Sequence, residues 1–154
     1  MDYYKPEMKI MKSVQINLLF FGFVINFVWE MLQMPFFSYP ADTSLTRINL
    51  ACIQASAGDA AMIVIAFWVV VFLQKDRKWY LHPSVRSLAF FLLPGVIMTI
   101  VFEAMATGAI HRWAYANSMP TLPVLGTGLV PIAQWLLLPL VIIFIVRRQV
   151  RQTD

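Results

Sequence analysis

The chain has 154 residues, of which 60% are hydrophobic and 13% are charged, and its formal net charge is +4. A soluble domain usually has about 45–50% apolar residues, so the composition excludes that class and predicts an integral membrane protein. Membrane topology and anionic lipid headgroups explain the positive charge, and we expect no nucleic-acid partner. Cys52 is the only cysteine, which excludes an intrachain disulfide and a CxxC redox pair.

Four apolar stretches are long enough to cross a bilayer as helices, at about residues 14–37, 55–74, 87–105 and 129–146. They predict an all-α, integral membrane four-helix bundle that forms one domain over residues 1–154. The first stretch is longer than the apolar region of a signal peptide, which has about 7–15 residues, so we expect a retained helix.

The distribution of basic residues predicts the orientation, because Lys and Arg beside short loops stay on the cytoplasmic side. Of the 12 such residues, only Arg47 and Arg112 fall on the opposite side. Both termini are therefore predicted to be cytoplasmic, in a multi-pass protein of the plasma or inner membrane.

The first predicted helix carries a polar stripe within an apolar, aromatic sequence. Asn26, Glu30 and Gln33 follow one another at a spacing that places them on one helix face. We interpret Asn26, Trp29 and Gln33 as substrate-binding residues around the acid Glu30.

The two connectors on either side of the second helix carry weaker signals. Thr43 and Ser44 are candidate caps for an earlier start of that helix. Residues 75–86 are interpreted as a plain connector, with Trp79 and Tyr80 at the level of the lipid headgroups.

One acidic residue lies at a similar depth in each of the first three helices: Glu30, Asp59 and Glu103. Each is 15 or 16 residues from the helix end that basic residues flank. A rise of about 1.5 Å per residue then places all three about 22–24 Å from that face of the bilayer. Gln134 on the fourth helix is predicted to reach the same layer and is a further candidate substrate-binding residue.

Ionisable groups at this depth are costly, so they usually face a cavity or the interior of a bundle. We interpret Glu30, Asp59 and Glu103 as the catalytic residues of one site on the non-cytoplasmic side. Close carboxylates in a low dielectric cannot all ionise, so at least one is expected to stay protonated. The alternative is that each carboxyl group only hydrogen-bonds a neighbouring helix as a structural contact.

The segment from residue 106 to residue 128 is rich in glycine and proline and is predicted to be an irregular loop. A loop of this length is often a lid or a binding loop. It adds four candidate substrate-binding residues: His111, Arg112, Trp113 and Tyr115. Two alternatives stay open, namely headgroup binding by Arg112 and a solvated position for His111.

Metal and cofactor chemistry has little support in the sequence. Glu30, Asp59, Glu103 and His111 are suitable ligands for a hard metal ion, but no ExxH or HxxE spacing occurs. A metal site is the lesser alternative, and we expect no metal and no cofactor. The nucleophile elbow, the phosphate loop and the dinucleotide fingerprint are also absent, which argues against acyl transfer and nucleotide chemistry.

Two short stretches resemble known families. The run from Asn26 to Glu30 resembles the Asn-x-x-Trp-Glu motif of integral membrane terpene cyclases, which implies that Glu30 protonates a polyprenyl substrate. Residues 30–37 and 131–139 resemble segments of the emopamil-binding and sigma-2-receptor group, small helical proteins that hold sterols or cationic amphiphiles around buried acids.

The chain also departs from both families. The cyclases are larger, and the sterol-binding group carries the comparable acidic motif on its second helix, whereas Glu30 lies on the first. The roles of Asp59 and Glu103 therefore rest on depth and spacing alone.

An aromatic, apolar cavity with acids at one end suits a ligand that bears an amine, an alkene or an epoxide. We expect the protein to bind or convert a hydrophobic isoprenoid or sterol-like molecule, as an isomerase or cyclase if it is an enzyme. The alternatives are a non-catalytic subunit or assembly factor of a membrane complex, and a small proton or metal transporter. A homodimer or a larger complex is left open.

Overall fold

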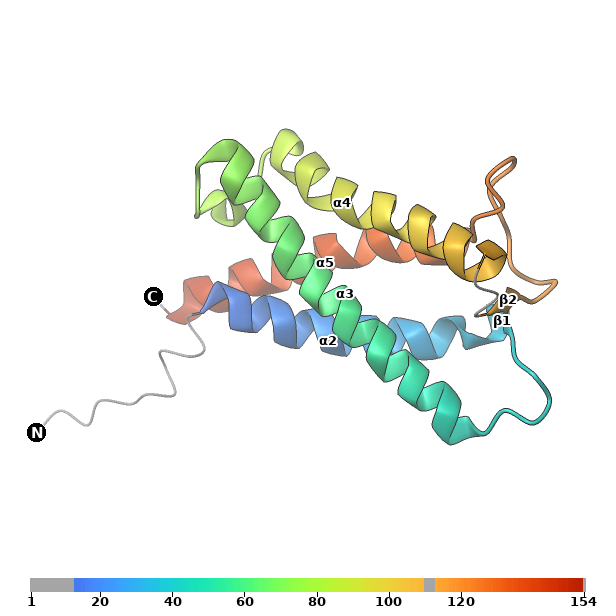
Figure 1. The fold of residues 1–154 in the computed structure, drawn as a ribbon. Coiled ribbons are helices and arrows are strands. Elements are labelled where there is room, and N and C mark those ends of the chain that lie inside the picture. Colours follow the sequence, from blue (N-terminus) through green and yellow to red (C-terminus); the bar gives the residue numbers. More distant parts are fainter. Residues whose placement is uncertain (1–12, 110–112, 154) are drawn as a thin grey trace, which may run out of the picture.

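The computed structural model describes residues 13–109 and 113–153 (Figure 1). Four of its helices are long and apolar enough to cross a membrane. They confirm the predicted all-α, four-helix membrane architecture. The elements are, in chain order, α2 (Val14–Gln33), η1 (Met34–Phe36), β1 (Phe37–Ser38), α3 (Leu45–Gln74), η2 (Trp79–Leu81), α4 (Val85–Ala104), the π-helical turn η3 (Met105–Ala109), β2 (Ala114–Tyr115) and α5 (Leu129–Thr153).

Serine caps define where three of the helices begin. The Ser44 hydroxyl accepts a hydrogen bond from the Arg47 amide at 3.3 Å, so α3 begins at Leu45, about ten residues before the predicted apolar span. Ser13 and Ser84 cap α2 and α4 in the same way. The extra turns of α3 belong to the same candidate membrane span, Leu45–Gln74.

The four helices form a closed ring of contacts, in which α2 packs against α3 and α5, and α4 packs against the same two helices. In Figure 1, α3 runs obliquely across the bundle, so that α3 and α4 diverge toward the end that carries β1 and β2. We call this the β end. The start of α2 and the end of α5 lie at the opposite end of the bundle.

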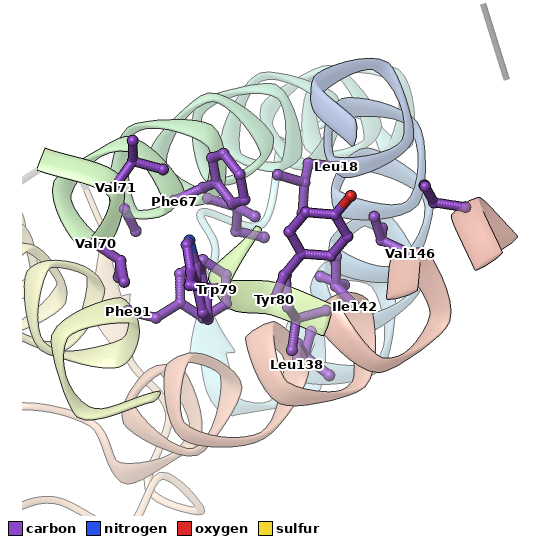
Figure 2. Packing of buried hydrophobic residues seen from close by; sticks show 14 of the residues in the cluster. Leu18, Phe67, Val70, Val71, Trp79, Tyr80, Phe91, Leu138, Ile142 and Val146 are labelled. Atoms are coloured by element: carbon purple, nitrogen blue, oxygen red, sulfur yellow. The ribbon is translucent and has the colours of Figure 1, made fainter. Parts of the chain in front are cut away.

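The apolar core lies at that opposite end, where η2 joins α3 to α4. Trp79 and Tyr80 are 2% and 6% exposed and point between the helices, as Figure 2 shows. The Trp79 ring is 5.6 Å from Phe67 and 5.3 Å from Phe91. The prediction of a plain connector with both aromatics at headgroup level was therefore wrong, because their rings fill the space between α3, α4 and α5.

A short β-ladder closes the β end. Phe37 of β1 pairs with Tyr115 of β2, and Ser38 pairs with Ala114, in antiparallel register. The Phe37 ring also lies 5.7 Å from the ring of Tyr115 and 6.4 Å from that of Trp113. The loop after α4 is consequently fixed to the end of α2, where the sequence predicted only an irregular segment.

Candidate functional site

One glutamine side chain connects three helices near the middle of the bundle. The Gln134 Nε2 atom on α5 lies 2.9 Å from Asn26 Oδ1, 2.9 Å from Asp59 Oδ2 and 3.3 Å from Glu30 Oε1. We call Asn26, Glu30, Asp59 and Gln134 the amide cluster. Two of the three predicted catalytic acids, from α2 and α3, thus meet at one amide group.

Local packing explains why these side chains converge. Asn26 is 2% exposed, and its Nδ2 donates to the Gly22 carbonyl at 2.7 Å, which leaves Oδ1 directed at Gln134. A Cβ atom at Gly22 would lie 3.3 Å from the Ala60 Cα atom. These two small residues let α2 and α3 approach closely, and the approach brings Asp59, next to Ala60, beside Glu30.

The Gln134 amide nitrogen has fewer hydrogens than there are acceptors around it. An amide nitrogen carries two hydrogens, but three oxygen acceptors surround this one. The contact to Glu30 is the longest of the three. Two neighbouring carboxylates in a low dielectric also repel each other. A single proton held by Glu30 and Asp59 together relieves the repulsion and adds the missing hydrogen.

Two more predicted binding residues lie beside Glu30 on the same face of α2. The Trp29 indole Nε1 donates to Gln33 Oε1 at 3.1 Å, and the Gln33 side chain also hydrogen-bonds the Glu30 carboxyl group. Gln33 is only 5% exposed. These residues form one wall of an open groove of about 380 Å³ between α2 and α5, lined by Trp29, Leu32, Gln33, Phe36, Leu129, Val130 and Ala133.

Glu103, the third predicted acid, has different partners. Its Oε2 accepts hydrogen bonds from the Tyr115 hydroxyl and, at 3.4 Å, from the Trp113 indole Nε1. The Tyr115 oxygen in turn accepts from the Gly128 amide at 2.9 Å. We call Glu103, Trp113, Tyr115 and Gly128 the loop cluster.

The loop cluster lies close to the amide cluster without sharing its hydrogen bonds. Glu103 is near enough to Glu30 for their carboxyl groups to interact through space, and Asp59 interacts with Glu30 in the same way. The common depth predicted from residue counts therefore corresponds to real proximity. It does not give the three acids the same surroundings, because only Glu30 and Asp59 share the Gln134 amide.

Tyr115 is held as a phenol. Burial, and after it the hydrogen bond to Glu103, raise the pKa of Tyr115 well above its usual range. Tyr115 therefore keeps its proton at any ordinary pH and acts as a donor to Glu103. Its hydroxyl connects the end of α4 to the start of α5.

The remaining sequence candidates fall into two groups. His111 and Arg112 lie outside the described residues. Thr107, one turn after Glu103, donates through its hydroxyl to the Glu103 backbone carbonyl at 2.7 Å, within the π-helical turn. Over residues 13–109 and 113–153, no three His, Cys, Asp or Glu side chains are grouped so that they could hold a metal ion.

Sequence reasoning missed two glycines that shape the site. Gly22 sets the α2–α3 spacing, and a Cβ atom at Gly128 would lie 3.0 Å from Met119 Sδ and 3.2 Å from Tyr115 Cζ. The placement of Gly22 four residues before Asn26 was the available signal, because an asparagine within a helix often bonds the carbonyl one turn back. No comparable signal exists for Gly128, whose partners come from a distant part of the loop.

A scan of protein-family models, a search of curated proteins and a search of solved structures found no match to this chain.

Proposed function

We propose that this membrane protein binds a hydrophobic isoprenoid or sterol-like molecule at the amide cluster and converts it by proton transfer. The observation that supports the proposal is the shared amide, where Glu30 and Asp59 compete for the two hydrogens of Gln134. Such a pair holds one proton and one free carboxylate, which are the acid and the base of a proton-transfer reaction.

The unequal contacts support different roles for the two acids. Asp59 is the more firmly held, at 2.9 Å from Gln134 Nε2, whereas Glu30 is at 3.3 Å and adjoins the groove through Trp29 and Gln33. Glu30 is therefore the proposed acid and Asp59 the proposed base. Both are half-buried, so each retains one side that a ligand can approach.

Glu30 and Asp59 together supply and recover the proton that the proposed reaction needs. Protonated Glu30 adds its proton to a carbon–carbon double bond of the substrate, which forms a carbocation. Loss of a proton from a neighbouring carbon to Asp59 then forms a new double bond, before or after ring closure. Transfer of that proton from Asp59 to Glu30 restores the starting state.

Aromatic side chains support a cationic intermediate. Trp29 and Phe36 line the groove, and aromatic faces stabilise cations by about 0.5–2 kcal/mol. The groove lining contains no charged residue, so no counter-ion competes there for the cation.

Solvent deuterium tests the proposal. Purified protein in bilayers is incubated in D₂O with neutral isoprenoid alkenes and alcohols and with sterols, and the products are examined by mass spectrometry. Wild type is expected to place deuterium on carbon, because the acid exchanges its proton with solvent. Glu30→Gln should lower the rate by about 10²–10⁴-fold, the usual contribution of an acid–base group.

Asp42→Asn is the matched control, because Asp42 is an exposed acid in the α2–α3 connection and should leave the rate unchanged. Equal deuterium incorporation in wild type and Glu30→Gln contradicts the assigned acid. A large loss of thermal stability in Glu30→Gln, with no deuterium incorporation by wild type, instead favours the non-catalytic subunit.

A further inference from the structure

We propose that the hairpin at residues 121–128 anchors the β end of the protein in the membrane, with Val124 and Leu125 at its tip inserted among the lipids of the nearer leaflet. The hairpin contains no residue of the amide cluster, so the anchor does not depend on the reaction proposed there. Three features support the anchor: the strain and exposure of the tip, the absence of charge around it, and its place beside the α5 span.

Hydrogen bonds at its base give the hairpin a defined shape. Thr121 and Gly128 form an antiparallel bridge. Inside this bridge the Leu122 amide donates to the Thr127 carbonyl at 2.8 Å. Residues 123–126 therefore project as a tip from a fixed base, and all four of them are exposed.

Val124 has a backbone conformation that residues with branched side chains rarely adopt. Its φ is 73°, and the Leu125 amide closes a tight turn around it by donating to the Pro123 carbonyl at 2.9 Å. Glycine or asparagine adopts such a turn with less strain. The Val124 side chain is also fully exposed, at 104%, so no packing within the chain offsets the strain. An apolar side chain held outward in this way indicates a contact outside the chain.

The tip and its surroundings carry no charge. The sequence has no Asp, Glu, Lys or Arg between Trp113 and Val146, and Leu125 at the tip is 57% exposed. The α2–α3 connection reaches the same end of the bundle and differs, because it exposes the acid Asp42. Exposed apolar residues without charged neighbours mark contacts with a membrane or a protein, whereas a charged connection suits water.

The position of the hairpin favours the membrane as its partner. α5 and its candidate span both begin at Leu129, the residue after the hairpin. The apolar run at residues 129–146 extends about 27 Å at about 1.5 Å per residue, close to the bilayer core of about 30 Å, so Leu129 lies at the boundary of that core. In Figure 1 the orange hairpin before α5 turns to the side of the bundle at the end of α4, instead of continuing along the helices. The tip therefore stays at the level of the headgroups and reaches the lipid beside the bundle.

A polarity-sensitive fluorophore tests the anchor. Val124→Cys and, as the matched control, Asp42→Cys are each made in a Cys52→Ala background, labelled with NBD and reconstituted in phosphatidylcholine bilayers without any other protein. The label in Val124→Cys should have a blue-shifted emission and should lose intensity when the acyl chains of the lipid carry bromine. The label in Asp42→Cys should keep the emission of NBD in water and should be quenched by aqueous iodide instead.

Leu125→Cys provides a second position at the tip, because the positive φ occurs at Val124 and not at Leu125. Its label should respond as the label in Val124→Cys does, and circular dichroism checks that each variant is folded. Iodide quenching of both tip labels without any effect of brominated lipid overturns the anchor and leaves the tip to a protein partner. Equal lipid quenching in the tip variants and in Asp42→Cys also overturns it, because the tip then has no contact of its own.

Discussion

The amide cluster and the loop cluster each place a carboxyl group on a spanning helix among hydrogen-bond donors. They differ in whether donors or acceptors are in excess. In the amide cluster one amide faces three acceptors, two of them on carboxyl groups. In the loop cluster two donors, Trp113 and Tyr115, meet the single oxygen Glu103 Oε2. An acid with ample donors is fixed in place, whereas an acid short of donors keeps a proton to exchange.

The two clusters also differ in what they connect. The amide cluster joins α2, α3 and α5, of which α2 packs against both of the others. The loop cluster joins the end of α4 to β2 and to the start of α5. Glu103 therefore contacts the loop at the β end, and the proposed proton transfer rests on Glu30 and Asp59 alone.

The largest expected effect separates the two acids directly. Glu30→Gln should lower deuterium incorporation by about 10²–10⁴-fold, whereas Glu103→Gln should lower it by less than about tenfold. The glutamine at position 103 still accepts a hydrogen bond from Tyr115 and so retains the loop. Equal losses in the two variants would show that the three acids act as one unit, as their common depth first indicated.

The next effect concerns the packing that supports Gln134. A Cβ atom at Gly95 would lie 1.9 Å from Cε3 of Trp135, the residue after Gln134. Gly95→Ala should therefore lower stability by about 1–3 kcal/mol through overpacking, measured as a lower Tm in detergent, and should also reduce activity.

Gly58→Ala is the matched control for this helix-to-helix contact. An added Cβ at Gly58 meets no atom within 4 Å, so the change should keep activity and raise stability by up to about 1 kcal/mol through helix propensity. A similar Tm for the two alanine variants would contradict the close α4–α5 packing.

The fold could be predicted from the sequence to a greater extent than the site. The length and apolarity of the four spans determine the helices, and counting at about 1.5 Å per residue predicted that Glu30, Asp59 and Glu103 lie near one another. Residue counting gives the position of a side chain along the helix axis. It does not give the direction in which the side chain points around that axis. Which acid faces Gln134 depends on the contact between Gly22 and Ala60, and that contact is tertiary.

The structure of the loop after α4 was even harder to predict from the sequence. Nothing in the sequence pairs Phe37 with Tyr115, because two-residue strands carry no alternating pattern. Trp113 and Tyr115 were nominated as substrate-binding residues, and the structure gives both a partner in Glu103. That contact depends on how α4 ends, in a π-helical turn that local propensity does not reveal.

A smaller effect is expected from the loop cluster itself. Tyr115→Phe removes the hydroxyl that links Glu103 to the Gly128 amide and should cost about 0.5–1.5 kcal/mol. Amide hydrogen exchange should speed up at Gly128, while residues around Asn26 keep their protection. Tyr39→Phe is the control, because Tyr39 is 37% exposed and lies outside the cluster. Faster exchange around Asn26 in Tyr115→Phe would mean that the two clusters are coupled.

The smallest expected effect is a shift in the titration of one tyrosine. Burial is the first cause of the raised Tyr115 pKa and the hydrogen bond to Glu103 is the second, so Glu103→Gln should lower this pKa while leaving it above the usual value. Absorbance near the tyrosinate band, with Tyr115→Phe as the reference spectrum, isolates the single group.

The raised pKa of Tyr115 also determines how the stability of the protein changes with pH. A group with a raised folded-state pKa contributes stability that is complete below its unfolded pKa, which is about 10 for tyrosine, and loses it as the pH rises toward the folded value. Wild type should therefore lose stability above about pH 10 more steeply than Tyr115→Phe, and Glu103→Gln should lie between them. If the three proteins have parallel pH–stability curves, the phenol is not held by Glu103, and the contrast between the two clusters loses its electrostatic basis.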